Sequence, residues 1–211
     1  MVHSDVMPAS TPVIRLRRLG EPDSHGPPEF ERVAVVGLGG IGGAIAMAAR
    51  RAWPAALVIG VDQSAVVERA AGRHLIDVGS EDLGLVSEAD LILLTRSPAQ
   101  NAAAIDRLGA IVDGECVVSE LDDRAHGRFD AGLGLPPRLP FIPAHLVADA
   151  APATIDEADP DWLAGRTWLL VARQPGPDPV VDRMVRFVAG LGADPLVVSE
   201  DDLARRLARY R

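Results

Sequence analysis

The chain has 211 residues, of which 48% are hydrophobic and 24% charged, and its formal net charge is −9. This composition is typical of a globular protein with a buried core, and the negative charge disfavours nucleic acid or an anionic membrane as a partner. No apolar run reaches the roughly 18 residues that span a bilayer, and the first residues lack the basic and apolar parts of a secretory signal. We therefore expect a cytoplasmic protein.

Cys116 is the only cysteine of the chain. A single cysteine excludes an internal disulfide and a cysteine-based zinc cluster, and we predict no metal site. Because Cys116 lies in an apolar run with Val117 and Val118, we interpret it as a small core residue rather than a nucleophile.

The chain is predicted to begin with an extension, residues 1–30, that contains five prolines. Within it, residues 13–19 have the pattern of a short strand or arm, and residues 20–31 that of a linker. We expect this arm to lie outside the main sheet or to pack on a neighbouring molecule.

Strand and helix patterns alternate over residues 31–199. Apolar runs predict strands at residues 33–36, 57–61, 90–95, 115–119, 139–142, 167–172 and 195–198. Helices are predicted at residues 41–51, 64–71, 98–108, 122–132 and 178–191, with Ser64 as the N-cap of the second. This alternation predicts an α/β fold of the Rossmann type, a doubly wound and mostly parallel sheet with helices on both faces.

Residues 200–211 have the pattern of a final helix with Leu203 and Leu207 four positions apart. Such a pair packs against another surface, and we expect this helix or the N-terminal arm to contribute to a homodimer contact.

The segment 37–42 has the pattern G-x-G-x-x-G and consists of Gly37, Leu38, Gly39, Gly40, Ile41 and Gly42. It follows a buried strand and opens a helix, which is the context in which this pattern binds a dinucleotide. The first glycine makes a tight turn, the second lets the backbone approach a pyrophosphate, and the third lets the helix pack on the strand. The helix then presents free N–H groups and its positive dipole end to the phosphates.

Asp62 ends the second predicted strand, 20 residues after Gly42. A carboxylate there accepts hydrogen bonds from the ribose hydroxyls of the adenosine and repels a 2′-phosphate. Gln63 and Ser64 supply no cation for that phosphate, so we expect NAD rather than NADP. An aspartate that only caps the following helix is the alternative. Gln63 follows directly and is included in the predicted site.

Thr95 and Arg96 follow the next predicted strand, where loops line the cofactor site. We expect Arg96 to contact a pyrophosphate or a substrate carboxylate, with a plain surface arginine as the alternative.

Over about residues 32–205 the chain resembles the nucleotide-binding domain of the prephenate and arogenate dehydrogenase family. The segments VAVVGLGGIGGAIAMAAR, VIGVDQS, HLID, ADLILL, FIPAHLVAD and LAGRTWLLVA carry the resemblance. His145, followed by Gly165 to Trp168, is its more specific part. The resemblance implies an NAD(P)-dependent oxidation, with loss of carbon dioxide, of a cyclohexadienol in aromatic amino acid biosynthesis.

The resemblance also implies that His145 bonds the ring hydroxyl of the substrate and assists proton removal. An imidazole suits this task because its ordinary pKa lies near 6.5. A partly buried histidine satisfied by the backbone is the alternative.

The chain departs from the family pattern in its second half. Leu-Val-Ala-Asp follows His145 in place of Pro-Met-Ala-Gly. Asp123 stands where the family has a serine that contacts substrate and nicotinamide, and the family lysine nearby is absent. Glu120, Asp122 and Asp123 would repel a dicarboxylate such as prephenate. An altered substrate, such as an amino-bearing ring, is therefore expected if the site catalyses hydride transfer.

The helical dimerisation domain of the family has no counterpart in these 211 residues. A homodimer contact or a partner protein is therefore expected to substitute for it, and we expect little turnover of prephenate by this chain alone. A non-catalytic dinucleotide-binding module, which acts through a partner or as a sensor, is the alternative function.

Overall fold

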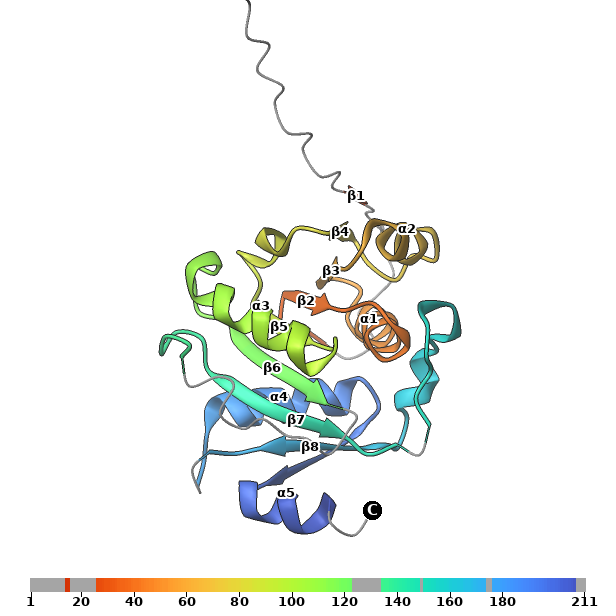
Figure 1. Cartoon of the computed structure of the whole chain (residues 1–211). Helices are drawn as coiled ribbons and strands as arrows, with labels where there is room; N and C mark the ends of the chain where they lie inside the picture. Colours follow the sequence, from red (N-terminus) through yellow and green to blue (C-terminus); the bar gives the residue numbers. More distant parts are fainter. Residues whose placement is uncertain (1–13, 16–25, 123–133, 149, 174–175, 208–211) are drawn as a thin grey trace, which may run out of the picture.

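Strands from the whole described length of the chain form one nine-stranded sheet (Figure 1). The computed structural model describes residues 14–15, 26–122, 134–148, 150–173 and 176–207. The strands are β1 (Ile14–Arg15), β2 (Arg32–Val36), β3 (Leu57–Val61), β4 (Val78–Ser80), β5 (Leu91–Leu94), β6 (Val117–Asp122), β7 (Phe141–Leu146), β8 (Thr167–Val171) and β9 (Asp194–Val198). The α-helices are α1 (Gly40–Ala52), α2 (Ser64–Gly72), α3 (Pro98–Ile111), α4 (Pro179–Gly190) and α5 (Glu200–Leu207).

The order of the strands is β1-β4-β3-β2-β5-β6-β7-β8-β9. The six strands from β4 to β7 in this order are all parallel. Only β1, on β4, and β8, on β7, pair antiparallel within the described sheet. This is the Rossmann arrangement, so the predicted fold class is confirmed. As predicted, the segment 167–198 extends the same sheet, because β9 pairs parallel with β8.

The sheet is covered on both faces, which is why its central strands are continuous apolar runs. Side chains of α1, α2 and α4 share a core with alternate residues of β2, among them Val33 and Val35. Helix α3 packs on the opposite face with Ala34 and Val36. Strands β2 and β5 are neighbours, yet the chain leaves β2 toward β3 on the other side. The carboxyl ends of β2, β3 and β5 therefore surround the topological switch point, where ligands of such sheets bind.

Two segments near the ends of the chain pack on the sheet. Ile14 pairs with Gly79 and Arg15 with Val78 of β4, so the prediction that the arm lies outside the sheet is wrong for these two residues. Leu203 of α5 is buried with Leu169 and Val171 of β8, so it packs on its own sheet, and the homodimer contact stays a prediction.

Two strands of the second half lie further along the chain than predicted. Strand β6 extends to Asp122 and β7 to Leu146, whereas the predicted strands ended at residues 119 and 142. Glu120 and His145 are therefore strand residues. The predicted helix at 122–132 is wrong at Asp122 and otherwise lies outside the described residues. Strand β4 was not predicted, because three residues including Gly79 carry no periodic signal.

Candidate dinucleotide-binding site

Gly37 makes the turn that carries the chain from β2 to α1. Its φ of +108° lies in the region that favours glycine. A Cβ on this residue would lie only 2.8 Å from Thr95 Oγ1 and from Arg96 Cγ. The Thr95 hydroxyl donates to the Gly37 carbonyl at 2.6 Å, and the Gly37 amide donates to the Val61 carbonyl at 2.9 Å. The end of β5 thus holds the glycine turn in place.

Gly42 allows α1 to pack closely against this turn. A Cβ on Gly42 would overlap the carbonyl oxygen of Gly37. A Cβ on Gly40 would likewise overlap the carbonyl of Pro152, which belongs to the segment that follows β7. Both residues therefore need to be glycine because backbone lies against them.

Gly39 has open space beside its Cα. The nearest atom to a Cβ built there is the Ala153 carbonyl oxygen, at 3.9 Å. The amides of Gly39, Gly40 and Ile41 make no hydrogen bond within the described part of the chain. Free amides at the start of a helix, beside an open glycine, are the donors that a pyrophosphate needs. The residues present therefore fit a dinucleotide.

Asp62 follows β3 and ties the glycine segment to the end of that strand. Its Oδ2 accepts from the Leu38 amide at 2.6 Å, and its Oδ1 accepts from the Gln63 amide at 2.7 Å. The side chain is 19% exposed, so one edge of the carboxylate reaches solvent. A carboxylate can accept about four hydrogen bonds, which leaves capacity for ribose hydroxyls. The alternative of an aspartate that caps the next helix is not met, because Gln63 is the N-cap of α2 and Asp62 bonds the amide of that residue, outside the helix.

Arg96 crosses the end of β2 toward β3. Its Nη2 donates to the Val61 carbonyl at 2.8 Å and lies 4.0 Å from Asp62 Oδ1. Asn101 Oδ1 accepts from its backbone amide at 3.1 Å. The side chain is 25% exposed and therefore lies partly buried against the ends of these strands. Its approach to Asp62 could not be predicted from the sequence, since the two residues follow β5 and β3, which are separated by β2.

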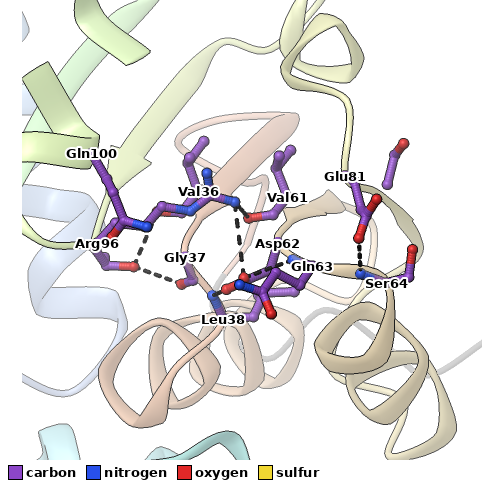
Figure 2. Close-up of polar contacts among 12 residues, drawn as sticks. Val36, Gly37, Leu38, Val61, Asp62, Gln63, Ser64, Glu81, Arg96 and Gln100 are labelled. Atoms are coloured by element: carbon purple, nitrogen blue, oxygen red, sulfur yellow. Dashed lines mark hydrogen bonds and ion pairs between the residues drawn. The ribbon is translucent and has the colours of Figure 1, made fainter. Parts of the chain in front are cut away.

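Glu81, which directly follows β4, was missed by the sequence reasoning. Its Oε1 accepts from the Ser64 amide at 2.5 Å, and this contact lowers the pKa of the Glu81 carboxyl (Figure 2). The prediction that Ser64 is the N-cap is wrong, because Gln63 is the N-cap and Ser64 the first helical residue. A carboxylate 17 residues away accepts instead from the amide of Ser64 itself, and no local pattern signals such a pair.

His145 lies in the other half of the sheet from the glycine segment. It is 7% exposed and stands on β7, in register with Asp122 of β6 and Leu169 of β8. Three strand spacings separate β7 from β2, or about 14 Å at the usual spacing. The segment after β7 returns to the first half, where Arg69 pairs with Asp156 at 3.1 Å and Arg73 donates to the Ala158 carbonyl at 3.1 Å. His145 is thus connected to the glycine segment through the chain that follows it.

Of the predicted acidic cluster Glu120, Asp122 and Asp123, the structure describes only the side chain of Glu120. Glu120 is 9% exposed and its Oε1 accepts from Asn101 Nδ2 at 3.1 Å, so it faces α3 and not an open loop. This corrects the expectation that Glu120 repels a substrate. Asp123 lies outside the described residues, and the side chain of Asp122 is not described either.

The described ranges contain neither a metal-binding cluster nor a membrane-spanning helix. No group of three or more His, Cys, Asp or Glu side chains there could hold a metal ion. None of the helices there is both long enough and apolar enough to cross a bilayer.

The fold is shared with solved dehydrogenases. An arogenate dehydrogenase from Synechocystis has a TM-score of 0.72 at 24% identity, over 84% of this chain and 63% of that one. A prephenate dehydrogenase from Aquifex aeolicus, in complex with hydroxyphenyl propionate and NAD+, has a TM-score of 0.74 at 18% identity, over 82% and 61%. A Ralstonia eutropha (S)-3-hydroxybutyryl-CoA dehydrogenase has a TM-score of 0.63 at 15% identity, over 81% and 64%.

The resemblance to prephenate and arogenate dehydrogenases is thus confirmed at the level of the fold. This chain spans about three fifths of the length of those solved structures. No protein-family model and no curated protein sequence matches it. The fold is that of dinucleotide oxidoreductases, and the identities do not extend this statement to a substrate.

Proposed function

We propose that the chain binds NAD along the glycine segment and acts as an NAD-dependent oxidoreductase on a cyclohexadienol-type substrate related to prephenate or arogenate. One observation carries this proposal: Thr95 and Asp62 hold the glycine turn by hydrogen bonds at the topological switch point. In this arrangement the space beside Gly39 is open, and the amides of Gly39, Gly40 and Ile41 make no hydrogen bond among the described residues. The solved neighbour with bound NAD+ supports the cofactor.

Each residue of the site has a separate task in this proposal. The amides of Gly39, Gly40 and Ile41 bind the pyrophosphate, and Asp62 binds the adenosine ribose. Arg96 places a positive charge beside Asp62 and the glycine turn, where it balances the carboxylate and faces the phosphates. Bound NAD would supply the acceptor for a hydride from the substrate ring. His145 would accept the proton of the ring hydroxyl, for which an imidazole is suited at neutral pH.

Calorimetric titration with NAD and with NADP tests the cofactor part. We expect saturable binding of NAD and weaker binding of NADP, because Asp62 disfavours a 2′-phosphate. Absence of binding for both, or tighter binding of NADP, would contradict the proposal. NADH formation with prephenate and with arogenate then tests the substrate class. Turnover of the amino-bearing arogenate but not of prephenate would support the altered-substrate form.

The burial of His145 favours a second candidate, a dinucleotide-binding module without catalysis. In that form the chain holds NAD and acts through a partner or as a sensor. NAD binding together with no NADH formation on any ring substrate would support this candidate. Light scattering across micromolar concentrations tests whether the chain forms a homodimer or needs a partner protein to complete the site.

A further inference from the structure

The start of α2 is occupied by two carboxylates of the chain itself. Asp62 Oδ1 accepts from the Gln63 amide at 2.7 Å, and Glu81 Oε1 accepts from the Ser64 amide at 2.5 Å. The two acids come from the carboxyl ends of neighbouring strands, β3 and β4. Figure 2 shows Glu81 over the first turn of α2 and Asp62 beside it.

This arrangement changes what the helix start can bind. The first amides of a helix normally attract anions, since they lack partners and lie at the positive end of the dipole. Here the amide that the helix offers first is already bonded to a carboxylate. Because the hydrogen bonds from Ser64 lower the pKa of the Glu81 carboxyl, it carries its negative charge at neutral pH.

The positive charges near this point are committed elsewhere. Arg96 lies on the other side of Asp62 from Glu81, with its Nη2 on the Val61 carbonyl (Figure 2). On α2 itself, Arg69 pairs with Asp156, and Arg73 donates to the carbonyls of Ile155 and Ala158. The Glu81 carboxylate therefore adds a second negative charge beside Asp62. Among the described residues, none of these arginines pairs with Glu81.

We propose that Glu81 is a specificity-determining residue, which excludes a 2′-phosphate and so makes the site select NAD over NADP. This inference rests on the proposed binding of a dinucleotide with its ribose on Asp62. A ribose held there turns its 2′ position toward the start of α2, where a phosphate would need amides or a cation. It meets instead an occupied amide and a like charge. Glu81 is exposed, so the expected effect is moderate.

The test compares the Kd values of NAD and NADP, measured by calorimetry, for wild type, Glu81→Gln, Glu81→Arg and the control Glu68→Gln. Glu68 is an exposed acid on the same helix, so its variant removes an equal charge away from the helix start. In Glu81→Gln the amide oxygen can still accept from Ser64, which preserves the fold. We expect NAD affinity within about twofold of wild type and NADP affinity about five- to tenfold higher. Glu81→Arg should strengthen NADP further, and Glu68→Gln should leave the ratio unchanged.

The outcomes separate this inference from the proposed function. If NAD binds wild type and the ratio of the two Kd values is the same in Glu81→Gln, Asp62 alone sets the preference and the inference is wrong. An equal change in Glu68→Gln would also overturn it, because the effect would then be long-range charge alone. If neither dinucleotide binds wild type, the proposed function fails and the inference fails with it. Protection of the Ser64 amide from hydrogen exchange reports separately whether Glu81 caps α2 in solution.

Discussion

The two halves of the sheet differ in how their candidate residues are held. Around β2, β3 and β5 the glycine turn, Asp62 and Thr95 bond one another through backbone groups. Around β6 and β7, Glu120 and His145 are buried strand residues, and Glu120 accepts a hydrogen bond from the side chain of Asn101. A site made by backbone geometry leaves a pattern of glycines and spacings. A site made by side chains on separate strands leaves none.

The largest effect should come from His145, if the second half carries out the chemistry. In His145→Gln we expect kcat with a ring substrate to fall about 10²- to 10⁴-fold, the usual contribution of a general acid or base. The Kd for NAD should stay within about twofold, since β7 lies several strand spacings from the glycine turn. Steady-state assays and calorimetry on the same preparation separate the two quantities. An unchanged kcat would leave His145 as a core residue and break the division of roles between the halves.

A clash at the glycine segment should be the next largest effect. Gly42→Ala places a methyl group on the Gly37 carbonyl, and we expect a loss of about 3 kcal/mol in unfolding free energy together with weak NAD binding. Gly72→Ala is the matched control, because Gly72 also lies in a helix and a Cβ there meets nothing within 4 Å. That variant should be neutral or more stable by about 0.5 kcal/mol. Urea unfolding measures both, and equal stability of the two variants would contradict the packing argument.

The contrast between the halves also explains what the sequence could predict. The glycines and Asp62 were found because a strand, a tight turn and a helix require particular residue types at particular spacings. The extent of β7 was not found, since Pro143 interrupts the apolar run and the predicted strand ended at residue 142, before His145. Glu81 and the approach of Arg96 to Asp62 depend on which strands become neighbours, which no local pattern reports.

Variants of Asp62 test whether this residue of the first half of the sheet both stabilises the fold and binds the cofactor. Asp62→Ala removes the acceptor of the Leu38 and Gln63 amides, so we expect about tenfold weaker NAD binding and a lower Tm. The preference for NAD over NADP should narrow at the same time. Asp62→Asn keeps one acceptor oxygen without the charge and should recover much of the Tm while still narrowing the preference. A preference that stays unchanged in both variants would show that Asp62 does not face the ribose.

The smallest expected effect concerns Cys116, which directly precedes β6 in the second half. We expect burial to keep its thiol unreactive. Cys116 is 2% exposed, and burial raises the pKa of its thiol to about 12, with the nearby Asp90 charge adding to this rise. At pH 8 the folded chain should therefore remain unlabelled by a thiol reagent such as iodoacetamide, followed by mass spectrometry, whereas the chain in denaturant should react fully.

The same shift has a consequence for stability. Because the folded pKa lies above the ordinary value of 9.0, the contribution of this thiol to stability is complete below about pH 9. It is lost as the pH rises toward 12, since the unfolded chain releases the proton first. Rapid labelling of the folded chain at pH 8 would instead place Cys116 at an accessible reactive site, and the second half would then hold a nucleophile that the buried strand β6 does not suggest.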